Sequence, residues 1–307
     1  MKRFIVTTTI NAPTKAVERF DAMEDWELIV IGDYKTPIDY KLARGRYVTP
    51  QEQEDFDPEL SDAIGWNCIQ RRNMGIAMAY EAGAEVVAVV DDDNIPLEGW
   101  GQNLMVGQDA EVNYYESALG AFDPIGATNY PHLWHRGYPL ELLSKRDYSL
   151  RSTQTVHVDI QADFWNGDPD IDAICRLEHA PDCEFDPDAF PIAASEISPF
   201  NSQNTFLSRR VLKHYFLYPY VGRMDDIWAA YYVQALGYRV AYGAASVVQE
   251  RNVHDLMRDM SNEIIGYMNN LALVTQVMKD PSAIVAYLPG KAIRAWDLYR
   301  KHFEGNE

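Results

Sequence analysis

Apolar and polar positions follow two alternating periods in the first hundred residues, and the two periods predict strands and helices in turn. Phe4–Thr9 is apolar and β-branched, Thr14–Met23 has apolar residues at helical spacing after Pro13, and Glu27–Ile31 is a second short apolar run. Short β-branched runs favour strands, and a spacing of three to four residues favours an amphipathic helix. The pattern therefore predicts a strand–helix–strand unit.

A longer helical pattern and a fully apolar strand follow this unit. The pattern predicts one helix over Ser61–Ala82, with Ser61 as its N-cap and Gly83 just beyond its end. Val86–Val90 has no polar position, as expected for a parallel strand that is buried on both faces. We expect this strand to join the first two in one parallel sheet.

The middle third of the chain has fewer long periodic segments and more Pro, Trp, Tyr and Asp. This composition predicts loops and short strands over the carboxyl edge of the sheet, where specificity for an acceptor would reside. Periodic segments return later, and they predict a helix over Asp226–Leu236, a strand over Arg239–Val248 and a helix over Leu256–Met278. The predicted class is α/β, with helices flanking a mostly parallel central sheet and a helical C-terminal extension.

Composition excludes several classes of protein. The 307 residues are 47% hydrophobic, which supports a buried core, and the three cysteines show no spacing typical of disulfides or zinc. A formal net charge of −19 disfavours nucleic-acid binding, which depends on Lys and Arg. No apolar run reaches the roughly 18 residues of a membrane-spanning helix, and the apolar run after Met1 is too short for a signal peptide. We expect a cytoplasmic protein.

Three consecutive carboxylates, Asp91, Asp92 and Asp93, directly follow the strand Val86–Val90. Successive side chains on an extended chain point to opposite sides, so Asp91 and Asp93 share one side and Asp92 faces the other. Two carboxylates on one side suit a Mg²⁺ or Mn²⁺ ion that also binds substrate phosphates. The alternative is a polar turn in which Asp92 or Asp93 caps a helix. Because open α/β sheets bind ligands at the carboxyl ends of their strands, the position favours the metal.

The ends of the first two strands lie at the same predicted edge. Hydroxyl, amide and carboxylate groups there are suited to bind a base and a ribose, and Gly32 would allow close approach of a ligand. The candidates are Thr8, Thr9 and Asn11 after the first strand and Asp33 and Lys35 after the second. The alternative is a pair of ordinary turns.

Arg71 and Arg72 are adjacent cations in an acidic protein, within the predicted helix Ser61–Ala82. The planar guanidinium of one of them is suited to clamp a diphosphate. A solvated helix face is the alternative.

A second acidic pair and a histidine complete the candidate chemistry. Asp225 and Asp226 come directly before an apolar helix, so they are either an N-terminal pair favoured by the helix dipole or a source of a general base. His254 follows the last predicted strand. It is either an ordinary loop histidine or a further ligand for a metal site begun by two carboxylates.

Ten segments occur in a consistent order over residues 4–270. They are Thr7–Lys15, Asp25–Trp26, Val30–Pro37, Arg72–Gly75, Asp91–Asn94, Arg136–Pro139, Asp163–Ile174, Pro199–Thr205, Arg223–Trp228 and Gln249–His254. Together they resemble the STELLO-type glycosyltransferase-like family, which looks related to the reversibly glycosylated polypeptides, a group of UDP-sugar mutases.

The resemblance implies a GT-A fold with a Rossmann-like, nucleotide-sugar-binding half over residues 1–130. The acceptor and catalytic half would cover 131–255, and the helical extension 256–307. By the same resemblance Asp91 and Asp93 engage ribose and metal, the Asp225–Asp226 pair supplies the base, and His254 is a late metal ligand. The stretch from Asn166 to Asp170 would lie near the sugar or the acceptor, without an assigned role.

The residues and the resemblance together predict a metal-dependent glycosyltransferase. It would move a sugar from a UDP-sugar to a hydroxyl of a glycan, a lipid-linked or another acceptor, with Mn²⁺ or Mg²⁺ as cofactor and with inversion by Asp226 or Asp225. A retaining front-face reaction is the alternative if neither acid reaches the acceptor. A UDP-sugar mutase, a non-catalytic sugar-nucleotide-binding scaffold and a nucleotidyltransferase are the rival functions. Leu143, which replaces an arginine of the mutase-like pattern, disfavours the mutase.

Overall fold

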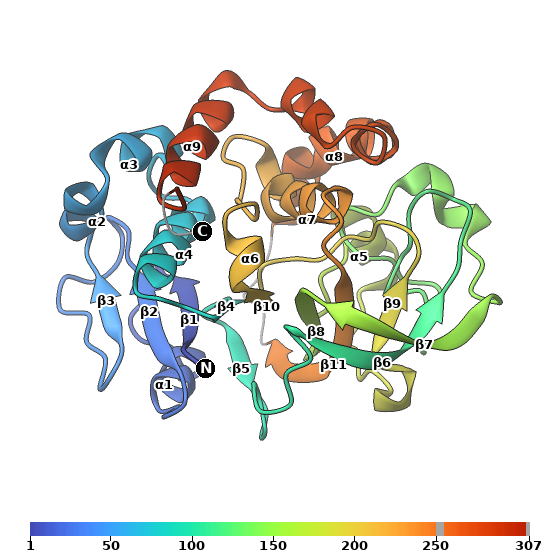
Figure 1. Cartoon of the computed structure of the whole chain (residues 1–307), viewed down its shortest axis with the longest axis horizontal. Coiled ribbons are helices and arrows are strands. Elements are labelled where there is room, and N and C mark those ends of the chain that lie inside the picture. Colours follow the sequence, from blue (N-terminus) through green and yellow to red (C-terminus); the bar gives the residue numbers. More distant parts are fainter. Residues whose placement is uncertain (250–254, 305–307) are drawn as a thin grey trace.

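The computed structural model describes residues 1–249 and 255–304, and these residues form an α/β fold around one sheet (Figure 1). The strands are β1 (Arg3–Thr8), β2 (Glu27–Ile31), β3 (Arg46–Val48), β4 (Val86–Val90), β5 (Asn94–Pro96), β6 (Gln108–Tyr115), β7 (Arg151–Val158), β8 (Ile160–Gly167), β9 (Ile192–Ala194), β10 (Asn204–Ser208) and β11 (Val240–Gln249). The helices are α1 (Lys15–Asp21), α2 (Pro50–Phe56), α3 (Pro58–Ile64), α4 (Arg72–Glu81), α5 (Ala173–His179), α6 (Arg209–Leu212), α7 (Asp225–Ala235), α8 (Leu256–Val277) and α9 (Gly290–Lys301). The predicted α/β class is confirmed.

The sheet is mixed, which corrects the prediction of a mostly parallel one. Its strand order is β3-β2-β1-β4-β10-β8-β11-β9-β6-β7, with β5 paired to β11. The first four strands are parallel, as predicted for β1, β2 and β4, whereas β3 was not predicted from the sequence. In the rest, β10 runs antiparallel to both β4 and β8, while β11 runs parallel to β8. The strand that joins the two halves therefore runs against its neighbours.

The parallel half has helices on both faces. Parallel crossovers are right-handed, and β2 and β4 lie on opposite sides of β1, so α1 and α4 cover opposite faces of the sheet. Gly75 allows α4 to approach closely, because a Cβ atom there would lie 2.5 Å from a methyl carbon of Val6 on β1. The carboxyl ends of β1, β2 and β4 consequently meet at one edge, as predicted.

The predicted helix Ser61–Ala82 is two helices, α3 and α4, separated by a break. α3 ends at Ile64, Gly65 has φ +83° and Asn67 has φ +57°, and a 3-10 turn over Ile69–Arg71 leads into α4. The N-cap is Asp57 rather than Ser61, since its side chain accepts a hydrogen bond from Leu60 N. The break turns the chain at the sheet edge where the acidic motif lies.

Long strands in the middle third also correct the prediction. Where loops and short strands were expected, β6, β7 and β8 each have eight residues. β6 and β7 form an antiparallel pair at the end of the sheet, and β8 belongs to its centre. The loops of this third lie between these strands rather than replacing them.

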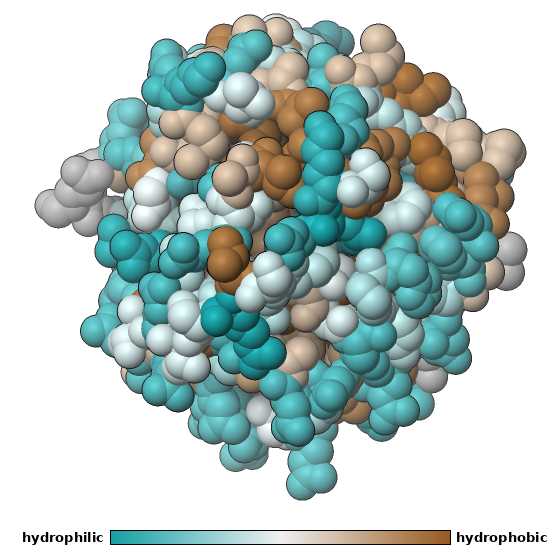
Figure 2. Space-filling model, turned by 90° about the vertical axis from the view of Figure 1, so that its right-hand side faces the viewer, coloured by the Kyte–Doolittle hydropathy of each residue, from teal (hydrophilic) through white to brown (hydrophobic). Residues whose placement is uncertain are grey.

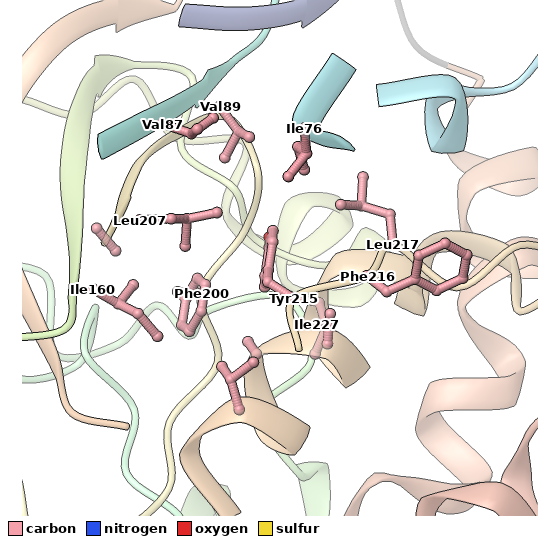
Figure 3. Close-up of a cluster of buried hydrophobic side chains, with 14 of the residues drawn as sticks. Ile76, Val87, Val89, Ile160, Phe200, Leu207, Tyr215, Phe216, Leu217 and Ile227 are labelled. Carbon is pink, nitrogen blue, oxygen red and sulfur yellow. The ribbon is translucent and has the colours of Figure 1, made fainter. Parts of the chain in front are cut away.

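A continuous core joins the centre of the sheet to α4 and α7 (Figure 3). The side chains that meet there come from three strands, β4, β8 and β10, from two helices, α4 and α7, and from the segment after α6. They include Ile76, Val87, Val89, Ile160, Leu207, Tyr215, Leu217 and Ile227, each at most 3% exposed. This packing fixes the start of α7, which carries the second acidic pair, against the sheet.

The C-terminal extension arches over the molecule and returns to its N-terminal half (Figure 1). α8 packs against α5 and α7, and α9 packs against α3. Phe303 closes on Tyr80 of α4 with ring centroids 4.4 Å apart. The predicted helical extension is therefore confirmed, and it packs against helices α3 and α4 near the start of the chain and against α5 and α7 farther on.

The outer surface of α8 is partly apolar. Met257, Ile264 and Met268 are large exposed apolar side chains on this helix. In Figure 2 apolar residues gather in the upper half of one face, at the height of α8, while the lower half is mainly hydrophilic. Of the helices that the structure describes, none combines the length and the apolar character needed to cross a bilayer.

Candidate functional site

The acidic motif lies in a turn between β4 and β5 at the carboxyl edge of the parallel strands. The turn is fastened to the loop before β10, because Asp91 N donates to Gln203 O at 3.1 Å and Asn94 Nδ2 donates to the same oxygen at 2.8 Å. The motif thus sits where β4 meets the antiparallel strand β10.

A pocket of about 340 Å³ opens beside the motif. It lies among the ends of β1, β2 and β4 and the break between α3 and α4. Its lining includes Thr8, Thr9, Asn11, Asp33, Asn67, Arg71, Arg72, Asp91, Asp92 and Asp93. Among the described residues, all the donor-side residues predicted from the sequence except Lys35 line this one pocket.

Asp92 contacts the segment that follows β1. Its Oδ2 atom accepts hydrogen bonds from Thr9 Oγ1 at 2.5 Å and from Asn11 Nδ2 at 3.1 Å, and its carbonyl accepts one from Thr14 Oγ1. Thr9, Asn11 and Asp92 therefore bind one another and shape the pocket rim. The alternative in which Asp92 or Asp93 caps a helix is wrong, because β5 follows the motif.

Arg72 binds the motif directly. Its Nη2 atom lies 2.7 Å from Asp91 Oδ1, and its Nη1 atom donates to Ser202 O at 2.5 Å and to Ser202 Oγ at 2.8 Å. Burial raises the pKa of the Asp91 carboxyl, and the Arg72 guanidinium opposes that rise. Nη2 is also 3.4 Å from Thr8 Oγ1, so Arg72 connects the ends of β1 and β4.

Arg71 is engaged elsewhere. Its Nε and Nη2 atoms donate to Gln53 Oε1 at 2.8 and 2.6 Å, Nη1 donates to Ser61 O at 3.0 Å, and the guanidinium lies 3.6 Å from the ring centre of Trp66. Burial lowers its pKa to about 10. Although Arg71 lines the pocket, Arg72 is therefore the one that contacts the acidic motif, and a solvated helix face describes neither.

The end of β2 contributes shape rather than ligand groups. The carboxylate of Asp33 accepts hydrogen bonds from Tyr34 N at 2.7 Å and Asn67 N at 2.6 Å, so it organises the loop. Gly32 lines the pocket and also makes room for Tyr47, whose hydroxyl would lie 2.3 Å from a Cβ atom on Gly32, and its predicted role in approach of a ligand stays a prediction. Lys35 is exposed and is absent from the lining of the pocket.

A second pocket of about 190 Å³ adjoins the first at the motif. Ile69, Asp91 and Asp93 line both pockets. The remaining lining comes from Gln70, Arg136, Ser202, Gln203, Gly222, Arg223, Asp225, Asp226 and Gln249. The two acidic pairs, more than a hundred residues apart in the sequence, thus share one cavity.

Asp226 belongs to a buried ion network that the sequence did not reveal. Arg136 lies between two carboxylates, with Nε and Nη2 each 2.9 Å from the oxygens of Asp170 and with Nη1 and Nη2 at 3.1 and 3.2 Å from those of Asp226. Ser202 N donates to Asp226 Oδ2 at 3.0 Å. Burial disfavours the charged arginine, but the two carboxylates raise the pKa of Arg136 well above its ordinary value.

Ser202 links this network to the donor-side pocket, because it also accepts from Arg72. Arg136, Asp170 and Ser202 each lie in a segment that carries the family resemblance, which was the only signal for them. Of the stretch expected near the sugar, Asp170 joins the network, while Asn166, Gly167 and Asp168 are absent from the lining of both pockets.

Asp225 has a different environment from its neighbour. Its Oδ2 atom accepts one side-chain hydrogen bond, from Gln70 Nε2 at 2.7 Å. Burial, reinforced by the negative charge of Asp226, raises the pKa of Asp225 to about 7. A carboxyl with this pKa exchanges a proton near neutral pH, whereas the oxygens of Asp226 are occupied by Arg136 and Ser202.

α8 supports the turn over Gly222–Met224, which leads directly into the acidic pair at the start of α7. Glu263 Oε1 accepts from Arg223 Nε at 2.8 Å, and a Cβ atom on Gly222 would lie 2.1 Å from the carbonyl oxygen of Asn262. Farther along the helix, Asn270 Nδ2 donates to the carbonyl of Gly137, next to Arg136. The helix therefore positions the acidic pair and Arg136 together.

The side-chain oxygen atoms around the acidic motif provide only part of a ligand set for a divalent cation. Among residues 1–249 and 255–304 no cluster of three or more His, Cys, Asp or Glu side chains is in place to hold a metal ion. Asp91 and Asp93 offer carboxylate oxygens at the junction of the two pockets. Mg²⁺ commonly binds through one or two carboxylates together with substrate phosphates, so the pair fits an ion that arrives with a diphosphate. His254 lies outside the described residues.

Comparison with known proteins gives two distant relatives and no match to a family model. The chain is 23% identical over 223 residues to the Arabidopsis thaliana protein named "Probable glycosyltransferase STELLO2", which covers 66% of this chain and 29% of that protein. STELLO1 of the same plant is 23% identical over 210 residues, covering 64% and 27%. The predicted resemblance to the STELLO proteins is confirmed as a distant relationship, and the chain spans under a third of their length.

A solved structure is also similar. Glucosyl-3-phosphoglycerate synthase from Mycobacterium tuberculosis, in complex with Mn²⁺, UDP-glucose and phosphoglyceric acid, aligns over 88% of this chain and 80% of its own, with a TM-score of 0.46 and 13% identity.

Proposed function

We propose that this protein is a glycosyltransferase that moves a sugar from a nucleoside-diphosphate sugar, most suitably a UDP-sugar, to an acceptor hydroxyl. The observation that carries the proposal is the junction of two pockets at Asp91 and Asp93, with Asp225 in the smaller one. The distant relationship to the STELLO proteins supports the same activity.

The larger pocket holds the donor in this proposal. Its volume of about 340 Å³ is within the range of pockets that bind small molecules, and it lies at the strand ends where α/β sheets bind nucleotides. Arg72 pairs with Asp91, which favours the charged form of this carboxyl against the effect of burial, while Thr9, Asn11 and Asp92 shape the rim. Asp91 and Asp93 hold a Mn²⁺ or Mg²⁺ ion, which supplies charge stabilisation to the departing nucleoside diphosphate when bound.

The smaller pocket holds the acceptor. Asp225 accepts the proton of the attacking hydroxyl, because its pKa near 7 allows it to be ionised at neutral pH and still basic enough to take a proton. Gln70 orients this carboxylate, and the Arg136–Asp226 pair fixes the start of α7 behind it. A base on the acceptor side favours in-line attack and inversion at the anomeric carbon.

A separate acceptor pocket also favours transfer over the rival functions. A mutase that interconverts ring forms of a UDP-sugar has no need of a second pocket with a base. The lining of the donor pocket comes from residues 8–93, whereas Arg136, Ser202 and the acidic pair of α7 contribute to the smaller pocket together with Gln70, Asp91 and Asp93.

Thermal and urea unfolding with nucleotides and metals test the donor side. UDP, GDP and dTDP are each added with Mn²⁺, Mg²⁺ or EDTA to the wild type, to Asp93→Ala and to the matched control Asp182→Ala, which changes an exposed acid. One nucleotide at 100 times its dissociation constant is expected to add about 2.7 kcal/mol to the free energy of unfolding. The gain should require the metal, vanish in Asp93→Ala and persist in Asp182→Ala. Absence of any gain with every nucleotide and metal would contradict the proposal.

A further inference from the structure

The pocket that contains Asp225 is small and lined by polar groups. Its volume of about 190 Å³ is below the roughly 300–1,000 Å³ of pockets that hold drug-sized ligands. One sugar ring or the end of a chain fits such a volume better than a long oligosaccharide. Ile69 and Gly222 are the two residues without a polar side chain among those that line it.

The described lining of this pocket is acidic. Four carboxylates line it, those of Asp91, Asp93, Asp225 and Asp226, against two guanidinium groups. A divalent ion at Asp91 and Asp93 would add two positive charges, which the diphosphate of the bound donor would offset. An acceptor that carries a phosphate or a carboxylate would therefore still meet more negative than positive charge at short range.

Both guanidinium groups are already paired with carboxylates. Arg136 binds Asp170 and Asp226. Arg223 donates from Nε to Glu263 at 2.8 Å, and its Nη1 atom lies 3.4 Å from Asp259. Within residues 1–249 and 255–304, the lining of this pocket thus offers no cation that is not already neutralised.

Amide side chains provide the remaining polar lining. Gln70, Gln203 and Gln249 all contribute to the pocket, together with the hydroxyl of Ser202. An amide offers both donors and an acceptor, and a carboxylate offers acceptors alone. A molecule with several hydroxyl groups can donate to the carboxylates and accept from the amides at the same time.

We propose that the acceptor is a neutral polyhydroxyl molecule, a single sugar ring or a glycan end, and that phosphorylated and acidic acceptors are rejected. This inference rests on the proposed transferase function and names the substrate class of its acceptor pocket. Gln203 contacts the acceptor, and the paired state of Arg136 and Arg223 is what excludes anions.

Release of UDP from UDP-glucose, in the presence of Mn²⁺, tests the acceptor class. Matched acceptors are compared: glucose with glucose 6-phosphate, galactose with galacturonate, and glycerol with glycerol 3-phosphate. The neutral member of at least one pair is expected to have a kcat/KM at least tenfold above its anionic partner. A preference for the anionic member overturns this inference while the transferase proposal stands. Absence of UDP release with every acceptor overturns both.

A variant pair tests the role of the amides. Within the described part of the structure, the Gln203 side chain makes one hydrogen bond, which its Oε1 atom accepts from Asn201 Nδ2 at 3.4 Å, so the fold should tolerate Gln203→Ala. The KM for the neutral acceptor is expected to rise about three- to tenfold, the equivalent of one hydrogen bond, with kcat within threefold of the wild type. The control Gln276→Ala changes an exposed glutamine on α8 and should alter neither constant. An unchanged KM in Gln203→Ala overturns the contact assigned to Gln203.

Discussion

Replacing Asp225 by asparagine is expected to make the protein more stable and nearly inactive at pH 8. The substitution keeps the size of the side chain and removes its negative charge. Gln70 can still bond the introduced amide, because a glutamine side chain offers its oxygen as readily as its nitrogen. The change therefore isolates the charge of Asp225 from its packing.

The magnitude follows from the raised pKa. The pKa of Asp225 rises from an ordinary 3.8 to about 7 because the carboxyl is buried and lies beside Asp226. Between these two values the folded chain holds a proton that the unfolded chain has lost, so the free energy of unfolding falls as the pH rises from about 4 through about 7. A shift of about three units corresponds to a cost on the order of 4 kcal/mol for the ionised carboxylate above pH 7. Asp225→Asn removes nearly all of this cost at pH 8 and roughly a third of it at pH 5, and it leaves stability unchanged only below about pH 4.

The neighbouring substitution should have the opposite effect. Asp226→Asn leaves Arg136 with one carboxylate instead of two and weakens the acceptor for Ser202 N. Breaking a buried ion pair by removing one partner typically costs about 3–5 kcal/mol. This variant is therefore the control: ionisation of Asp225 is expected to destabilise the fold, whereas the ionised carboxylate of Asp226 is expected to stabilise it.

Urea unfolding at pH 5 and pH 8 gives the stability of both variants and of the wild type. The rate of sugar transfer across the same pH range gives their activity. The kcat/KM of the wild type should rise with pH and level off above about pH 7, and Asp225→Asn should lose about 10²–10⁴ in kcat/KM together with this pH dependence. If Asp225→Asn is less stable than the wild type at pH 8, or retains its activity, the assignment of Asp225 as the base is refuted.

Two further variants test the surroundings of the acidic pair. Arg136→Lys replaces a planar fork that binds two carboxylates at once, and it should lower the free energy of unfolding in urea by about 3–5 kcal/mol; a loss under about 1 kcal/mol would contradict the network. Gly222→Ala and the control Gly237→Ala both place a side chain at positive φ, but only the first meets a carbonyl, that of Asn262. The first should be about 1–3 kcal/mol less stable than the second and less active, and equal stabilities would show that α8 does not constrain this loop.

Local sequence patterns were sufficient for β1, α1, β2 and β4 and for the position of the acidic motif, but they did not predict β3 or α2. The strand β4 has no polar position, and the carboxylates begin where it ends. These patterns involve residues that are next to one another in the chain, so they can be recognised without knowing any tertiary contact. The break between α3 and α4 had a local signal as well, in Gly65, but continued helical spacing on both sides concealed it.

Sequence by itself determined that this chain forms a strand–helix sheet with acids at its carboxyl edge and a second acidic pair before a late helix. Tertiary structure alone decided that β10 would enter the sheet antiparallel and that Arg136, Asp170 and Asp226 would meet. It also decided which of two adjacent aspartates is paired and which is left with a raised pKa. The physical reason is that the ion pairs and the burial of a side chain depend on groups brought together from distant parts of the chain. Two adjacent aspartates have the same side chain and the same local sequence, so their different partners cannot be predicted from that sequence.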